Sequence, residues 1–222
     1  RNDPDHIELS DAEAWRSTMV TSLTGSLFLL TDRPERWRTP FVDPAKRTAP
    51  VLVTTPGQPK IVDSMMSNSR IVNDVMTTED GKYGVFSREG ASDRKNGIVV
   101  FDASDPCHPR PVGEYTQTVS GGVHSSFVYQ GHVYLTDDAT GSLRVIDIRD
   151  PRNPREVGRW QTEQTEAGRY LHDIMVVDGL AYLAYWNAGL VILDVGNGMK
   201  GGSPTNPQFV SHCRVGRSVQ EC

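Results

Sequence analysis

The pattern that decides the fold reads IVVFD at 98–102, LRVID at 143–147 and LVILD at 190–194. A Pro-x-x-Pro turn follows each copy, beginning at Pro106, Pro151 and Pro204. A second short apolar run comes after each turn, with PVGEY at 111–115, EVGRW at 156–160 and QFVSH at 208–212. Proline fixes φ and lacks an N–H donor, so it suits a turn and disfavours a central strand. Each copy therefore predicts a hairpin of two strands.

A second hairpin is predicted upstream of each copy. These segments read VNDVMTTEDGKYGVF at 72–86, VHSSFVYQGHVYLT at 123–136 and LHDIMVVDGLAYLA at 171–184, and Gly81, Gly131 and Gly179 lie at their tips. Four short strands recurring about every 45–50 residues are typical of β-propeller blades. A β-solenoid is the alternative, although its repeats are usually shorter. A β-sandwich would not explain the recurring Asp and Pro positions.

The three aligned segments at 97–115, 141–160 and 188–197 resemble the LVIVD-repeat proteins. The resemblance covers residues 70–211 and, more weakly, 18–63. It implies a β-propeller, usually on exported or surface-associated proteins of bacteria and archaea, and it transfers no catalytic motif. The sequence departs from the pattern where the insertion GNGMKGG at 196–202 separates the last strand from its Pro-x-x-Pro turn.

The repeats predict the domain organisation. Residues 1–17 form an N-terminal extension, in which Ser10 and Glu13 make a capping-box pattern for a short helix near 11–17. Residues 18–222 hold the propeller repeats, with blades expected at 18–63, 70–115, 122–160 and 170–212. Because the last repeat loses its pattern, we expect either about four blades or part of a larger ring. A cut ring exposes apolar faces and strand edges, so we expect the isolated chain to self-associate.

Composition excludes two classes of partner. The net charge of −5 argues against a nucleic-acid binder and against a binder of anionic membranes. No apolar run reaches the roughly 18 residues of a membrane-spanning helix. The cysteines Cys107, Cys213 and Cys222 fit no zinc or redox motif. We expect free thiols, with a bond between Cys213 and Cys222 as the alternative.

Candidate site residues follow from blade topology. The first strand of a propeller blade lines the central channel, and its start shares one face with the loop after the second strand. The strand starts carry Asn73, Asp74, His124, Ser125, His172 and Asp173, and the loops carry Arg88, Glu89, Asp137, Asp138, Trp186 and Asn187. We predict that these positions converge at the channel mouth as a ligand-binding site.

Two interpretations of these polar residues stay open. In one, the His and Asp side chains join neighbouring blades by hydrogen bonds, because buried polar groups need partners. In the other, His124, His172, Asp74 and Asp173 hold a divalent metal, since imidazole and carboxylate are suitable ligands. The aspartates that end the repeated strands, Asp102, Asp147 and Asp194, have a simpler expected role in Asx turns.

No motif of a serine hydrolase, a P-loop or a zincin is present. The sequence therefore favours an exported or cell-surface binding or scaffolding module over an enzyme, with a protein or glycan as ligand. The alternative is a propeller metalloenzyme, an oxidase or hydrolase using the His/Asp site. No cofactor is predicted apart from that metal.

Overall fold

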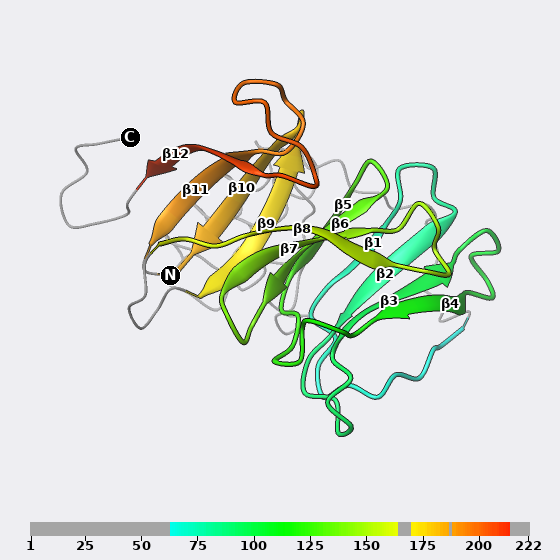
Figure 1. The fold of residues 1–222 in the computed structure, drawn as a ribbon. Helices are drawn as coiled ribbons and strands as arrows, with labels where there is room; N and C mark the ends of the chain where they lie inside the picture. Colours follow the sequence, from blue (N-terminus) through cyan, green and yellow to red (C-terminus); the bar gives the residue numbers. More distant parts are fainter. Residues whose placement is uncertain (1–62, 164–169, 187, 214–222) are drawn as a thin grey trace, which may run out of the picture. The chain divides into compact units, whose positions relative to one another are not determined.

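The computed structural model describes residues 63–163, 170–186 and 188–213, and this part of the chain contains strands and turns without helices. Twelve strands form three four-stranded antiparallel sheets, each in sequential order (Figure 1). The first blade consists of β1 (Val75–Thr77), β2 (Tyr83–Arg88), β3 (Gly97–Asp102) and β4 (Arg110–Tyr115). The second consists of β5 (Ser126–Tyr129), β6 (His132–Asp137), β7 (Ser142–Asp147) and β8 (Arg155–Trp160), and the third of β9 (Leu171–Val177), β10 (Leu180–Tyr185), β11 (Gly189–Asp194) and β12 (Gln208–Cys213).

These blades confirm the predicted all-β propeller architecture. The three described sheets do not close into a ring. The expected helix near 11–17 lies outside the described residues, and so does the expected blade at 18–63 except for its last residue. Among the described residues, no helix is long and apolar enough to cross a membrane.

Turn chemistry at the hairpin tips follows the sequence closely. Gln130 and Gly131 have φ values of 46° and 71°, and Asp178 and Gly179 have 49° and 74°. Positive φ at two successive residues is characteristic of a type I′ turn, whose twist matches that of the flanking strands. Glycine takes the second place in each pair because it adopts this conformation without strain.

The second blade is buried on both faces, and its two sides contribute to different hydrophobic clusters. Val133, Leu135 and Ile146 pack with the first blade, whereas Tyr134 and Val145 pack with the third. Because strand side chains alternate between faces, a sheet covered on both sides requires apolar residues at nearly every position. All six residues of β6 and all six of β7 are buried.

The repeated aspartates make the expected Asx turns. The Oδ1 atoms of Asp102, Asp147 and Asp194 each accept the backbone N–H two residues later, at 2.9, 3.0 and 3.0 Å. Asp194 also holds the insertion at 196–202, because its carboxylate accepts the N–H groups of Asn197, Gly198, Lys200 and Gly202. The β11–β12 hairpin therefore forms despite the insertion.

The expectation of three free thiols is wrong for Cys213, which is disulfide-bonded. Cys107 is a free and exposed thiol, as expected. Cys213 ends the last strand, β12. Cys222 lies outside the described residues.

Candidate functional site

The starts of the three inner strands lie together, because β5 packs against both β1 and β9. Each start carries a pair of polar residues, Asn73-Asp74, His124-Ser125 and His172-Asp173. The second members of the pairs contact one another across the blades, and so do the first members. The repeat spacing of the sequence thus produces two short rows of polar side chains.

The row of second members joins all three blades through one hydroxyl group. Ser125 Oγ lies 3.1 Å from Asp74 Oδ2 and 2.8 Å from Asp173 Oδ1. Asp74 Oδ2 also accepts the backbone N–H of Ser126 at 2.8 Å. Burial, reinforced by the charge of Asp173, raises the pKa of Asp74 above its ordinary value. This row supports the interpretation in which polar side chains join the blades.

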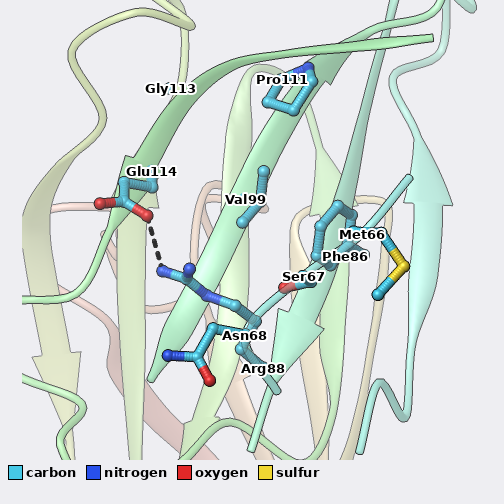
Figure 2. A pocket seen from close by; sticks show the side chains of 9 residues that line it. All are labelled: Met66, Ser67, Asn68, Phe86, Arg88, Val99, Pro111, Gly113 and Glu114. Atoms are coloured by element: carbon cyan, nitrogen blue, oxygen red, sulfur yellow. Dashed lines mark hydrogen bonds and ion pairs between the residues drawn. The ribbon is translucent and has the colours of Figure 1, made fainter. Parts of the chain in front are cut away.

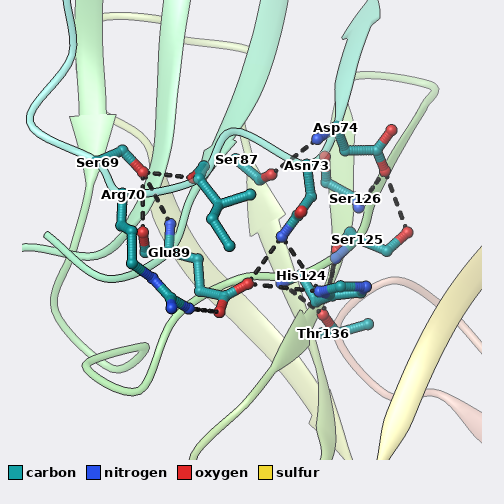
Figure 3. A network of polar contacts seen from close by, with 11 residues as sticks. Ser69, Arg70, Asn73, Asp74, Ser87, Glu89, His124, Ser125, Ser126 and Thr136 are labelled. Atoms are coloured by element: carbon teal, nitrogen blue, oxygen red, sulfur yellow. Dashed lines mark hydrogen bonds and ion pairs between the residues drawn. The ribbon is translucent and has the colours of Figure 1, made fainter. Parts of the chain in front are cut away.

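The row of first members centres on Glu89, in the loop after β2 (Figure 3). Asn73 Nδ2 donates to Glu89 Oε2 at 2.8 Å and lies 3.1 Å from His124 Nδ1. His124 Nδ1 lies 3.4 Å from Glu89 Oε2, and Arg70 Nη2 donates to Glu89 Oε1 at 3.0 Å. Burial opposes ionisation of Glu89, but these hydrogen bonds hold its pKa below the ordinary value. Glu89 is therefore an ionised acceptor beside the His124 ring.

Aromatic rings extend this row to the surface. The His124 and His172 ring centroids are 4.7 Å apart, and His172 lies 5.7 Å from Trp186. Tyr170 completes the group, with its ring 5.5 Å from Trp186 and 6.3 Å from His124. Trp186 is 61 % exposed, which is high for a residue of this size. We call Glu89, His124, Asp138, Tyr170, His172 and Trp186 the mouth cluster.

Asp138 contributes a second carboxylate to the mouth cluster. Burial raises the pKa of Asp138, while a hydrogen bond with Tyr170 opposes that shift. Its Oδ1 atom is buried and has no hydrogen-bond partner among the described residues. Gly122 makes room for this group, since a Cβ there would lie 2.8 Å from Asp138 Oδ2 and from Glu89 Cγ. A buried acceptor without a partner is uncommon in folded proteins and indicates a functional or solvent-bridged site.

The predicted site residues Asp137 and Arg88 lie in neither polar row and outside the mouth cluster. Asp137 Oδ2 is paired with Arg144 Nη2 at 2.6 Å, and Arg144 also contacts Glu156. Arg88 is buried and pairs with Glu114 at 2.8 Å on another side of the first blade. Both residues immediately precede a cluster member, and adjacent residues of a strand point to opposite faces. Predicted site residue Asn187 lies outside the described residues.

The sequence missed Tyr170, which the structure places at the site, and it assigned no separate role to Ser125. Tyr170 precedes β9 by one position and contacts both Asp138 and Trp186. Ser125 lies at a predicted strand start, and the structure adds that its hydroxyl contacts the carboxyl groups of two other blades. The shared register of Ser125, Asp74 and Asp173 was the signal that could have identified its role.

Comparison with known proteins identifies the family. The model of the LVIVD repeat matches residues 92–117, 120–162 and 168–215, which together exceed half of the chain. The chain belongs to the LVIVD-repeat family. The three matches fall on the three described blades of this LVIVD-repeat chain and confirm the resemblance noted from its sequence.

Two further comparisons concern curated proteins and solved structures. No curated protein matches the LVIVD-repeat chain. Among solved structures, it is similar to a structural genomics protein of unknown function from Bacteroides thetaiotaomicron, with 12 % identity and a TM-score of 0.40. That alignment covers 60 % of this chain and 31 % of the other, so the chain spans about a third of the length of that protein.

The metal site proposed from sequence involves His124, His172, Asp74 and Asp173. Among the described residues of the LVIVD-repeat chain, no three His, Cys, Asp or Glu side chains form a group that could hold a metal ion. The structure pairs the two imidazole rings with each other and the two carboxylates with Ser125. The metal site stays a prediction, and the contacts seen are those of blade joining and of an aromatic surface.

Proposed function

We propose that this chain is the binding module of an exported or cell-surface protein and that its mouth cluster binds a glycan. The observation that carries the proposal is Trp186, a large aromatic ring 61 % exposed at the edge of a buried polar row. The ring of Trp186 offers a flat apolar surface to the apolar face of a sugar. Glu89 and Asp138 supply acceptors for sugar hydroxyl groups at the same place.

Charge narrows the class of glycan. Burial is the main cause of the raised pKa of Asp138, and the charge of nearby Glu89 adds to it. Arg70 is the cation paired with Glu89, and its side chain is 68 % exposed. An anionic ligand would face both carboxylates, so a neutral glycan fits the mouth cluster better than an acidic one.

One observation and one expectation support export. Cys213 is disulfide-bonded, and disulfides persist mainly in oxidising compartments. The family resemblance also implies a location outside the cytoplasm. The proposed location is therefore the periplasm or the cell surface.

A glycan array tests the proposed ligand directly. We expect the labelled chain to retain a defined set of neutral glycans, and we expect Trp186→Ala to reduce the affinity for them at least about tenfold, as for a central aromatic contact. Phe209→Ala is the matched control, because Phe209 is also a half-exposed aromatic residue but lies on β12. An array without hits, or equal binding by Trp186→Ala, would contradict the proposal.

A further inference from the structure

A concave site lies on the first blade, and none of the mouth-cluster residues lines it. A cavity of about 330 Å³ opens on the first blade beside the segment at 66–68 (Figure 2). Its volume lies within the range of small-ligand pockets. The lining residues come from that segment and from β2, β3 and β4: Met66, Ser67, Asn68, Phe86, Arg88, Val99, Pro111, Gly113 and Glu114.

Two polar atoms of this lining are buried without a partner in the described part of the chain. Arg88 Nε has no hydrogen-bond partner there, although the Arg88 side chain is only 8 % exposed. Ser67 Oγ is also buried and has no partner among the described residues. Buried donors are nearly always satisfied in folded proteins, so two unpaired donors at one cavity point to a ligand that supplies an acceptor.

The charge of the cavity is balanced before any ligand binds. Arg88 Nη2 donates to Glu114 Oε2 at 2.8 Å, and Figure 2 shows this pair at one side of the lining. The pair leaves the Nε–H of Arg88 available while it neutralises the positive charge. A ligand carboxylate would meet Glu114 at short range, whereas an uncharged oxygen would not. The unpaired donors therefore favour a neutral acceptor.

Apart from Asn68 and Gly113, the rest of the lining is apolar. Phe86 and Val99 belong to a hydrophobic cluster that is separate from the core shared with the second blade. Pro111 adds an apolar ring without an N–H donor. Met66 adds a flexible thioether side chain, and this residue is 94 % exposed. A flexible methionine adapts its shape to different apolar groups.

We propose that this cavity binds a neutral carbonyl compound with a short branched apolar substituent, of the kind found in a capped hydrophobic amino acid. The carbonyl oxygen accepts hydrogen bonds from Arg88 Nε–H and Ser67 Oγ–H. The apolar substituent packs on Phe86, Val99 and Pro111. The site is distinct from the mouth cluster and needs none of its residues.

The test uses the full chain with ¹³C-labelled methionine methyl groups and NMR detection. The probe is N-acetyl-L-leucine N′-methylamide, and the signal of Met66 is assigned with Met66→Leu. We expect a saturable shift of the Met66 methyl signal, and we expect isovalerate, which has a carboxylate in place of the amide, to bind more weakly. Absence of a saturable shift overturns the proposal, and so does tighter binding of isovalerate.

Substitutions identify the donors. Arg88→Lys retains the charge but removes the Nε–H donor, and we expect it to weaken binding about tenfold or more. Ser67→Ala removes the other donor without altering a paired group, and we expect a loss of about threefold or more. Arg155→Lys, at an exposed arginine of β8, and Trp186→Ala should bind as the unmodified chain does. The proposal is overturned if the Ser67→Ala variant and the Arg88→Lys variant both bind the probe as the unmodified chain does. The amide spectrum of each variant checks that it is folded.

Discussion

At the scale of single residues, Ser125 lies between two carboxyl groups but has one proton to donate. Its hydroxyl is within hydrogen-bond distance of Asp74 and of Asp173. If both carboxyl groups are ionised, Ser125 donates to one and leaves its own oxygen lone pair facing the other. A proton on Asp74 removes this conflict, which agrees with the raised pKa of Asp74. The ionised form of Asp74 therefore destabilises the fold at neutral pH.

We predict that Asp74→Asn stabilises the chain at neutral pH by about 1 kcal/mol. Because Ser125 and Ser126 both contact Asp74 Oδ2, the amide oxygen takes that place and accepts the Ser126 N–H. The gain comes from removing a buried charge that lies near Asp173. A raised pKa means that the folded chain binds the proton more tightly than the unfolded chain, so Asp74 becomes less favourable as pH rises through its folded pKa. The advantage of the variant should grow as pH rises from the ordinary pKa of aspartate to the raised pKa of folded Asp74. Below the ordinary pKa the advantage should vanish. Urea unfolding at a series of pH values measures it.

Asp80→Asn is the matched control for this experiment. The Thr78 hydroxyl and the Lys82 N–H both donate to Asp80 Oδ1, and they lower the pKa of Asp80. A lowered pKa has the opposite effect on stability from a raised one. Asp80 therefore contributes stability that is lost as pH falls through its folded pKa. The control variant should therefore be less stable than the unmodified chain near neutral pH. Parallel pH profiles for the two variants would contradict the assignment of the effect to Asp74.

At this scale the sequence predicted part of the site. Equal spacing of the repeats was sufficient to bring Asn73, His124 and His172 together. The spacing was not sufficient for Arg88, because successive strand residues point to opposite faces of the sheet. An error of one position therefore places a side chain on the wrong face. Tyr170 lies just before a strand, where the repeat pattern gives no information about side-chain direction. Its role depends on the position of Asp138 in another blade.

At the scale of elements, each blade carries the same irregularity between its third and fourth strands. The register shifts between Val100 and Phe101, between Val145 and Ile146, and between Ile192 and Leu193. In the first two blades a glycine lies opposite the residue before the shift, and these are Gly113 and Gly158. A Cβ at Gly158 would lie 2.1 Å from the carbonyl oxygen of Pro204, in the turn of the next blade. The VG pair of the repeat thus marks where one blade touches the Pro-x-x-Pro turn of the next.

We predict that Gly158→Ala destabilises the chain by about 1–3 kcal/mol, the range for an overpacked site. The clash is with backbone, so a change of side-chain conformation does not relieve it. Thermal or urea unfolding measures the loss. Arg155→Ala on the same strand is the control, since the Arg155 side chain is 73 % exposed and should have little effect. Equal stability of Gly158→Ala and the unmodified chain would show that the blades separate easily at this contact.

The element scale is also where the sequence was most informative. The strands, tip glycines and Asx turns followed from short-range patterns in which apolar alternation and turn residues agreed. The repeated strand shift was not predicted, because it depends on packing against the next blade. A disulfide of Cys213 was only the alternative to free thiols, because the sequence positions of cysteines do not define the distance between them.

At the scale of the whole molecule, cysteine chemistry connects the fold to the proposed location. Cys107 is free and Cys213 is disulfide-bonded. We predict that one thiol per chain reacts with Ellman's reagent under denaturing conditions without reductant, and that three react after reduction, matching the cysteine count. Cys107→Ser should abolish the reaction without reductant. Three reactive thiols in the unreduced, secreted chain would remove the support that the disulfide gives to export.

The face of the third blade that carries Met175 and Val177 of β9 is the last feature at this scale. Ile174 and Val176 of β9 pack in the core shared with the second blade, whereas Met175 and Val177 point to the other face and are 49 % and 43 % exposed. Apolar strand residues without a covering layer favour association with another sheet.

We predict that the chain self-associates through the face that carries Met175. Met175→Glu places a charge on that face without touching the core, so it should raise the dissociation constant of the self-associated form by about tenfold or more. Light scattering over a concentration series measures the change. Met199→Glu is the control, because Met199 is 60 % exposed in the loop held by Asp194 and lies on no sheet. If the two variants associate alike, the contact lies elsewhere; if the unmodified chain stays monomeric at high concentration, this face does not drive association.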